Sequence, residues 1–426
     1  MRLDPPSALS ITRACESTAG NTFRLVPDPP VFVRGDGPWL VDADGRRYLD
    51  LVCGSATTNL GHAHPAHLAA LREVLASGIL HTGTRLPSVF RAELYQRLCS
   101  VLPAQLHYFH LANSGAEAME AAIKAAQFAT GRRRLIAFEG GYHGRTIGAL
   151  SITHAERIRA PFSTLDSLVD FLPYPDATGS ADAGLAALDD RLSALRRENG
   201  LPAAIVIEAV QAVSGVIGPN VDFLRGVRDI ASRHDVPLVL DEIWNGFGRT
   251  GRWFGFQHAG IEPDMVVMGK GLSAGLPLSA VAAGERFLKA WPPGMHTSTF
   301  QGNPAACAMA VATIDVISRD NLLSHVSSMV APAMETALAA LLGLPGIAAV
   351  RVAGAQAAIQ FHRDGLPDGN RSANLQRRLL REDLLVYGGG RQSDCLMLLP
   401  PINLEPEVLN PALTRIVDAV RSEPRE

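Results

Sequence analysis

The sequence has few cysteines, and they follow no recognisable pattern. Five cysteines lie scattered along 426 residues, with no Cys-x-x-Cys pair and no other spacing typical of a metal site. An odd number of unpaired positions argues against a disulfide framework and indicates the reduced thiols of a cytosolic protein. We therefore expect neither a disulfide scaffold nor a bound metal.

Long apolar runs and blocks of one charge are also missing. No apolar stretch approaches the roughly 20 residues that a membrane-spanning helix needs, and the first residues contain no signal-peptide core. The 39 basic and 42 acidic residues give a net charge of −3, and no basic block is longer than Arg132-Arg133-Arg134. We therefore expect a cytoplasmic protein with neither a membrane nor a nucleic acid as its partner.

What the chain does have is enough apolar residues, 47%, for a large core that fills two domains or one large one. Residues 1–30 are rich in proline and polar groups and are typical of a loosely structured arm. Residues 31–50 contain short apolar runs broken by Gly-Asp and Asp-Gly pairs, a pattern that predicts small antiparallel strands.

Between about residues 105 and 290, short apolar runs alternate with helix-length segments. This alternation predicts an α/β domain whose mainly parallel sheet is covered on both faces and holds its ligand at the carboxyl ends of the strands. The runs are LIAF (135–138), AIVIE (204–208), PLVLDE (237–242), MVVMGK (265–270) and AVAAG (280–284).

The last third of the chain predicts a second, smaller α+β domain. A helical stretch follows Pro304, and AAIQF (357–361) and LLVYGGG (384–390) are strand-like. We expect this part to pack with residues 31–50. The predicted division is an arm and part of the small domain at 1–60, a large domain at 61–310 and a C-terminal small domain at 311–426.

Three ionisable residues end three successive apolar runs: Glu208, Asp241 and Lys270. Each could be an ordinary polar group at the edge of a core, but together they indicate a shared crevice. A fourth signal is the Asn113-Ser114-Gly115 turn before a strong helix-forming run. Ser114 and Glu117 have the spacing of a capping box, which is a sufficient structural reason for the serine, yet such a helix start also suits a phosphate.

An amine, an acid and a phosphate turn are the parts that a pyridoxal phosphate (PLP) site requires. A buried lysine amine can attack an aldehyde, and a carboxylate can keep a pyridine nitrogen protonated. In the GGYHGRT segment (140–146), Tyr142 could stack on an aromatic ring and Arg145 could bind a carboxylate, although a surface turn explains the segment equally well. A nucleotide enzyme is the alternative, but the chain has no GxxxxGK[ST] loop.

Five segments resemble the signature segments of the class III (ornithine, acetylornithine and GABA type) aminotransferases, PLP enzymes of fold type I. The similarity covers about residues 31–405 and includes their order and spacing. The segments are NSGAEAMEAAIKAA, FEGGYHGRTIGALSIT, DEIWNGFGRTG, MGKGLSAGLPLSAV and STFQGNPAACAMA.

The resemblance implies a role for each matching residue. Lys270 would form the Schiff base with PLP and shuttle the proton, and Asp241 would pair with the pyridinium nitrogen. Thr299 would reach the phosphate of the neighbouring subunit's cofactor, which implies a homodimer. The remaining cofactor-binding positions would be Ser114, Gly115 and Ala116 around the phosphate, Tyr142 stacked on the ring, and Glu208 nearby.

Three departures from the family pattern fall on substrate-facing positions. Val213 stands where many members have a gating glutamate, and Met397 stands where they have the arginine that binds an α-carboxylate. The joint loss of both charges is electrostatically coherent, because neither is left buried without its partner. Trp244 replaces a glutamine that reaches the cofactor's ring oxygen, so it could either donate that hydrogen bond or close part of the pocket.

These features predict an aminotransferase with a ping-pong mechanism. Its substrate would be an ω-amino acid, a β-amino acid, an amine or an intermediate of specialised metabolism, with Arg145, or alternatively Arg34, as the carboxylate anchor. A PLP-dependent aminomutase, epimerase, decarboxylase or lyase of the same family is the alternative. A PLP-fold protein without catalysis is disfavoured by the intact Lys270 and Asp241.

Overall fold

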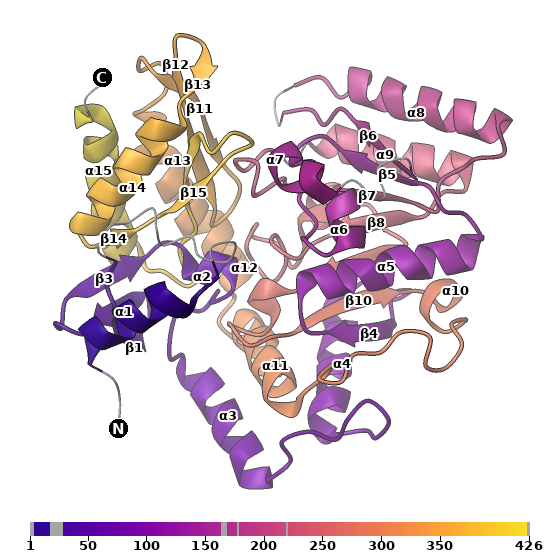
Figure 1. Cartoon of the computed structure of the whole chain (residues 1–426), viewed down its shortest axis with the longest axis horizontal. Helices are drawn as coiled ribbons and strands as arrows, with labels where there is room; N and C mark the ends of the chain where they lie inside the picture. Colours follow the sequence, from indigo (N-terminus) through magenta and orange to yellow (C-terminus); the bar gives the residue numbers. More distant parts are fainter. Residues whose placement is uncertain (1–3, 18–28, 163–167, 177–178, 219, 424–426) are drawn as a thin grey trace.

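The apolar runs of the middle region form strands of one seven-stranded sheet in the computed structural model, which describes residues 4–17, 29–162, 168–176, 179–218 and 220–423 (Figure 1). The strand order is β4-β10-β9-β8-β7-β5-β6, and only β10 runs antiparallel to its neighbours. The mainly parallel α/β sheet is thereby confirmed. Its strands are β4 (Tyr108–Ala112), β5 (Leu135–Phe138), β6 (Val169–Leu172), β7 (Ala204–Glu208), β8 (Leu238–Asp241), β9 (Met265–Met268) and β10 (Ser279–Ala283).

Alternate residues of each strand pack on opposite faces of this sheet. On β7, Ile205 and Ile207 face the core that includes α8 (Asp182–Arg197) and α9 (Val221–His234). Ala204 and Val206 face the other core, which α5 (Gly115–Thr130) covers. A strand buried on both faces must be apolar at every position, which is why the sequence shows continuous runs rather than alternation.

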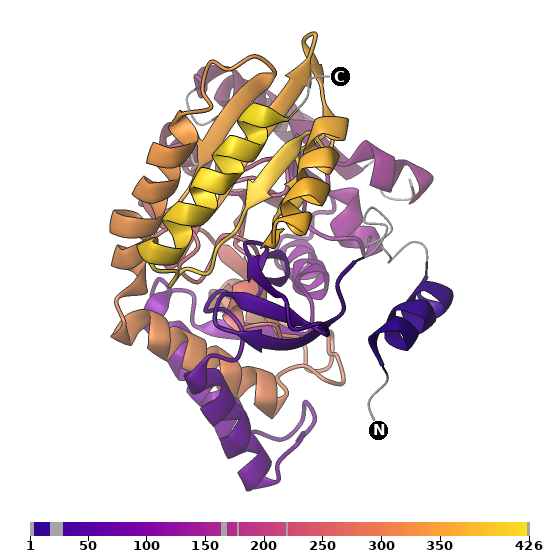
Figure 2. The same cartoon turned by 90° about the vertical axis from the view of Figure 1, so that its left-hand side faces the viewer.

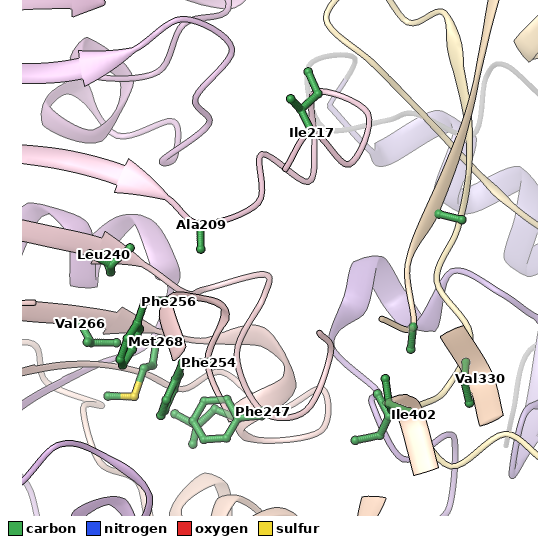
Figure 3. Close-up of a cluster of buried hydrophobic side chains, with 14 of the residues drawn as sticks. Ala209, Ile217, Leu240, Phe247, Phe254, Phe256, Val266, Met268, Val330 and Ile402 are labelled. Carbon is green, nitrogen blue, oxygen red and sulfur yellow. The ribbon is translucent and has the colours of Figure 1, made fainter. Parts of the chain in front are cut away.

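Aromatic side chains fill the core at the carboxyl ends of the central strands (Figure 3). Phe254 stacks on Phe256 with ring centroids 5.7 Å apart, and Phe247 meets Phe254 edge-on at 5.5 Å. These rings pack with Leu240 and Met268 in one buried cluster. This packing fixes the loop that leads away from β8, and with it the floor of the crevice above the strand ends.

The smaller domain combines the two ends of the chain, as expected (Figure 2). The antiparallel strands β1 (Phe32–Asp36), β2 (Trp39–Asp42) and β3 (Arg47–Asp50) continue through a parallel pairing of β3 with β14 (Leu384–Leu385). The second sheet contains β11 (Ile347–Val352), β12 (Ala357–Arg363), β13 (Leu366–Pro367), β15 (Tyr387–Gly389) and β16 (Cys395–Leu398). LLVYGGG, predicted as one strand, therefore supplies β14 to one sheet and β15 to the other.

Helices pack on the second sheet and on one another. In the small domain these are α13 (Ala331–Ala339), α14 (Gly369–Arg381) and α15 (Pro406–Ser422). A further group of helices packs around α11 (Pro304–Arg319), namely α3 (Pro65–Ser77), α4 (Val89–Val101) and α12 (Leu322–His325). The short helices are α2 (Cys53–Ala56), α6 (Ile147–Ser151), α7 (Glu156–Arg159) and α10 (Glu285–Leu288). The helix expected after Pro304 is α11, which packs against α3 and α4.

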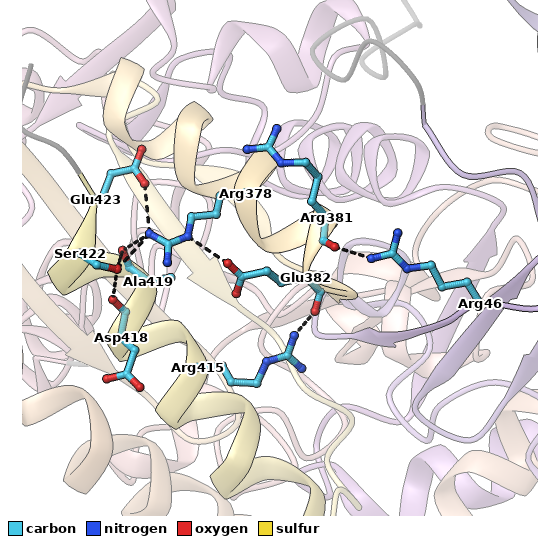
Figure 4. A network of polar contacts seen from close by, with 9 residues as sticks. All are labelled: Arg46, Arg378, Arg381, Glu382, Arg415, Asp418, Ala419, Ser422 and Glu423. Carbon is cyan, nitrogen blue, oxygen red and sulfur yellow. Dashed lines mark hydrogen bonds and ion pairs between the residues drawn. The ribbon is translucent and has the colours of Figure 1, made fainter.

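Polar contacts tie the N-terminal strands to the C-terminal helices (Figure 4). Arg46, in the turn between β2 and β3, pairs with Asp383 and donates a hydrogen bond to the backbone carbonyl of Arg381. Arg378 of α14 binds Glu382 at 3.0 Å and the hydroxyl of Ser422 on α15 at 3.0 Å. The network joins residues more than 300 positions apart in the sequence and adds to the pairing of β3 with β14 that unites the two ends of the chain.

Part of the predicted arm is helical, which corrects the expectation of a loose structure. Pro5–Cys15 forms α1, whose N-cap Asp4 accepts a hydrogen bond from the backbone N–H of Ser7 at 3.0 Å. Prolines in the first turn are favourable because their missing N–H groups would have no partner there. Residues 18–28 of the arm lie outside the described residues, and the exact domain boundaries stay a prediction. No described helix combines the length and apolar character needed to cross a membrane.

Candidate active site

The three ionisable groups expected at strand ends lie together. Glu208 and Asp241 are register partners at the ends of β7 and β8, and Lys270 follows the last residue of β9 by two positions. Lys270 has a φ of 44°, a left-handed conformation that is costly for a residue with a Cβ. The chain therefore turns sharply at Lys270, where the strand ends and the next short helix begins.

A cavity of about 340 Å³ opens at these strand ends. Of the candidate site residues from the sequence, all line it except Ser114, Thr299 and the alternative anchor Arg34. The lining residues are Gly115, Ala116, Tyr142, His143, Gly144, Arg145, Glu208, Val213, Asp241, Ile243, Trp244 and Lys270.

His143 is a part of this site that the sequence reasoning missed. Its Nδ1 lies 2.7 Å from Asp241 Oδ2, and both side chains are almost completely buried. Burial acts to lower the pKa of His143, but the hydrogen bond and charge of Asp241 and the charge of Glu208 outweigh it and raise that pKa. The signal was present in GGYHGRT, since a histidine between two proposed ligand-binding residues lies on the same turn.

Glu208 supports the loop that carries Tyr142. Its Oε1 accepts a hydrogen bond from the backbone N–H of Tyr142 at 2.8 Å. Burial raises the pKa of Glu208 to about 7, and the negative charge of Asp241 acts in the same direction. Glu208 therefore holds the Tyr142 backbone beside the cavity, a role that the sequence did not reveal.

Lys270 and Trp244 are in direct contact. The amine Nζ lies 3.5 Å from the centroid of the Trp244 ring. Burial lowers the pKa of Lys270 to about 7, although the charges of Asp241 and Glu208 oppose this shift. A lysine of this kind carries a substantial neutral fraction near neutral pH, as a nucleophilic amine requires.

The start of α5 has both features that the sequence suggested. Ser114 and Glu117 form a capping box, in which the Ser114 hydroxyl accepts the Glu117 N–H at 3.2 Å. Gly115 and Ala116, the first residues of the helix, line the cavity. The structural reading of Ser114 is thus correct, and the positive end of a 16-residue helix still points toward the cavity.

The positions that depart from the family pattern are adjacent. Met397, fully buried on β16, belongs to one apolar cluster with Trp244, and Val213 and Tyr387 pack against that cluster. The cluster lies on the small-domain side of the cavity. Val213 and Trp244 therefore give this side of the cavity an apolar lining, with Met397 packed behind it.

The remaining predicted residues, Arg145, Arg34 and Thr299, lie in three different places. Arg145 reaches the cavity, and its Nε donates a hydrogen bond to the Tyr142 hydroxyl at 3.1 Å. Arg34 is an exposed residue of β1 and does not line this cavity. Thr299 is also exposed and lines a separate hollow with Thr82 and Arg85, not the cavity that holds Lys270.

The donor set of the cavity fits pyridoxal phosphate. The α5 N-terminus suits the phosphate, the Asp241 carboxylate suits a protonated pyridine nitrogen, and the Lys270 amine suits the aldehyde. The buried Nε1–H of Trp244 has no hydrogen-bond partner among the described residues, and so is available to a bound group. Fold and site together define an α/β enzyme of the PLP-dependent type.

Comparisons with known proteins agree with this assignment of a PLP-dependent enzyme. The family model "Aminotransferase class-III" matches residues 26–420. An acetylornithine aminotransferase of Archaeoglobus fulgidus is 38% identical over 70% of this chain and 75% of its own length. A diaminobutyrate–2-oxoglutarate aminotransferase of Haemophilus influenzae is 33% identical over 92% of this chain and 91% of its own length.

Solved structures give the same result. An (S)-enantioselective omega-transaminase from Thermomicrobium roseum superposes with a TM-score of 0.89 at 26% identity, covering 99% of both chains. The chain therefore belongs to the class-III aminotransferase family and is a PLP-dependent aminotransferase. The resemblance, the fold, the enzyme class and the cofactor expected from the sequence are confirmed.

Proposed function

We propose that this aminotransferase acts on an amino donor that is not held through an arginine on its α-carboxylate. The donor would be an ω-amino acid, a β-amino acid or an amine, and any carboxylate distant from the reacting amine would bind Arg145. The observation that carries the proposal is the apolar cluster of Val213, Trp244 and Met397 beside the cavity.

The distribution of charge around the cavity supports this choice. Arg145 and Lys270 are the only arginine and lysine among the described residues that line it. Arg249, the arginine of the DEIWNGFGRTG segment, is fully buried and donates to the Ala355 and Pro400 carbonyls and to Asn59. It is thus committed to the protein interior. Relatives named for acetylornithine and for diaminobutyrate are both similar to this chain, so family membership leaves the donor open.

The residues of the cavity have distinct tasks in the proposed reaction. When bound, the cofactor supplies an aldehyde that captures the amino group and a ring that withdraws electrons from the reacting carbon. Lys270 holds the cofactor and then moves the proton at the reacting carbon. Asp241, held by His143, would favour a protonated ring nitrogen, and Tyr142 would stack on the ring. Dividing amino transfer into two half-reactions replaces one difficult step by easier ones.

The proposal includes a homodimer in which Thr299 completes the neighbouring subunit's phosphate site. Thr299 is exposed and lies outside the cavity of its own chain. Several large apolar side chains near it are also exposed: Leu80 at 72%, Leu86 at 63% and Phe300 at 67%. An apolar patch of this kind is typical of a surface that a second subunit covers. The mass in sedimentation equilibrium and the cofactor affinity of Thr299→Ala test this part.

A half-reaction screen tests the proposed donor class. The yellow enzyme is mixed with single amines, ω-amino acids, β-amino acids and α-amino acids, and loss of the absorbance of the lysine-bound cofactor is followed. We expect the first three groups to react and glutamate to react poorly. Rapid bleaching by glutamate alone would contradict the proposal.

The Arg145→Gln variant separates the two kinds of donor. It should raise the KM of ω-carboxylate donors by roughly 10- to 100-fold, the value of a charge-assisted bidentate contact, and leave simple amines unaffected. A requirement for a carbonyl acceptor distinguishes amino transfer from mutase, epimerase, decarboxylase or lyase chemistry. The cytoplasmic location expected from the sequence remains a prediction.

A further inference from the structure

Trp244 lies in an unusual environment for a tryptophan. Its side chain is only 6% exposed, yet its Nε1–H has no partner among the described residues, and its ring lines the cavity. A buried N–H normally has an acceptor, because leaving it unpaired costs stability. Its environment therefore points to a task in the cavity rather than to packing alone.

The face of the same ring is occupied by the lysine amine. Lys270 Nζ lies 3.5 Å from the ring centroid, well within the roughly 6 Å range of a cation–π contact. Among the described residues, the Trp244 ring is the group that the Lys270 amine contacts at this short distance. The ring therefore fixes where the amine lies when no other group binds it.

We propose that Trp244 is a positioning residue: its indole face is the seat that the Lys270 amine occupies whenever the amine is not bonded to the cofactor. The inference rests on the proposed function, in which an amino donor displaces Lys270 from the cofactor. The seat keeps the released amine at the cavity wall, where it can exchange a proton with the reacting carbon.

The surroundings of Trp244 hold the indole in place for this task. Tyr387 meets the ring edge-on, with centroids 6.0 Å apart and planes at 64°. Met397 belongs to the same apolar cluster and Val213 packs against it. The three departures from the family pattern thereby form one apolar packing unit around the indole.

Charged groups face the amine from several elements. Asp241 at the end of β8 and Glu208 at the end of β7 favour its protonated form, while burial and the charge of Arg249 favour the neutral form. The pKa of Lys270 is about 7 as a result. A further shift of this pKa by the Trp244 ring would therefore fall near neutral pH, where the protonation of the amine is easy to measure.

The experiment follows capture of pyridoxal phosphate by the apoprotein across pH 5 to 10. The capture rate depends on the neutral amine, and the ionisations of the aldehyde itself are the same for every variant. Trp244→Leu removes the π-face and should lower the midpoint of the profile by roughly one pH unit, a tenfold change in proton affinity. Trp244→Phe keeps a π-face and should retain a midpoint close to that of the wild type.

Two control variants show that the midpoint reports the Lys270 amine and its contact with Trp244. Lys270→Met should abolish capture, and Trp253→Leu, which removes a tryptophan that packs on the large core outside the cavity, should leave the midpoint unchanged. A merely structural role of Trp244 would slow capture equally at all pH values without moving the midpoint. That result for Trp244→Leu would overturn the proposal.

A second measurement remains decisive if Trp244→Leu does not fold. The fluorescence of Trp244 is obtained by subtracting the emission of the Trp244→Phe apoprotein from that of the wild-type apoprotein. This difference should change with pH around 7. In the Lys270→Met background the same difference should be independent of pH. Identical titrations with and without Lys270 would contradict the seat. If the donor screen fails but the fluorescence still titrates only when Lys270 is present, the proposed donor class is refuted and the seat is supported.

Discussion

Restoring the charged gate of other family members tests the apolar wall most directly. Met397 is fully buried on β16 between β12 and β15, where its register partners are Ala358 and Tyr387. Met397→Arg places a guanidinium at this position without a partner, and an uncompensated buried charge costs about 3–5 kcal/mol. We expect that loss in the free energy of unfolding.

Val213→Glu should compensate part of this loss. A Cβ added to Gly389 would lie 2.2 Å from Met397 Sδ and 3.3 Å from the Val213 carbonyl, so the two residues flank Gly389. The Gly390 N–H also donates to the Val213 carbonyl at 3.0 Å. Because both residues flank Gly389, we expect the two new charges to pair, with a coupling free energy of about 1–3 kcal/mol between the two substitutions.

The assay is a double-mutant cycle at one fixed protein concentration. Urea unfolding of the apoproteins is followed by near-ultraviolet circular dichroism, and the half-reaction with glutamate is measured on the PLP-loaded forms. The double variant should be more stable than the sum of the single losses predicts. It should also react with glutamate roughly 10- to 100-fold faster than the wild type, because a charge-assisted contact to the α-carboxylate is added.

Two results would refute this reasoning. If Met397→Arg is as stable as the wild type, the site of Met397 is not sealed from water. If the losses in the double variant are additive, Val213 and Met397 do not face each other. Met397→Leu, which keeps the volume and the apolar character, is the matched control and should cost less than about 1.5 kcal/mol.

Further outcomes concern the residues around the cofactor. Lys270→Met should lower kcat/KM by more than about 10⁴-fold, since covalent capture and proton transfer both disappear; residual activity above that level in a steady-state assay would contradict its role. His143→Leu leaves the buried Asp241 carboxylate without its partner and should cost about 3–5 kcal/mol in urea unfolding; a neutral effect would show that the pair contributes no net stability. Burial raises the pKa of Glu208 from its ordinary 4.5 to about 7, so the folded protein binds a proton at this carboxyl more tightly than the unfolded chain does. The stability that this difference contributes is fully present below pH 4.5 and is lost as the pH rises through 7. The Glu208→Gln apoprotein should therefore lose less stability than the wild type between pH 5 and 8, which thermal unfolding in a buffer series measures. Tyr142→Ala should raise the Kd for pyridoxal phosphate by roughly 3- to 10-fold, and Tyr142→Phe should not, if ring stacking is its contribution.

Much of the fold could be predicted because its central strands are buried on both faces. Such strands must be apolar throughout, so LIAF, AIVIE and MVVMGK are visible in the sequence without any tertiary information. The strands β4 and β6 were not predicted. Residues 108–110 and 169–171 in them are only partly buried, and their mixed composition carries a weaker signal.

The sequence also determined which residues end the strands, and hence that Glu208, Asp241 and Lys270 would share one crevice. Parallel strands bring their carboxyl ends to the same edge of a sheet, so order along the chain was sufficient. The capping box of Ser114 and Glu117 is equally local, because all its partners lie within four residues.

Only the tertiary structure decided the contacts that join distant segments. His143 meets Asp241 across 98 positions, and the parallel pairing of β3 with β14 divides LLVYGGG between two sheets. The contact of the Lys270 amine with the Trp244 ring likewise joins the segments that follow β9 and β8. Such contacts depend on the packing of whole elements, which brings together residues that no local pattern relates, and the chemistry of this site depends on them.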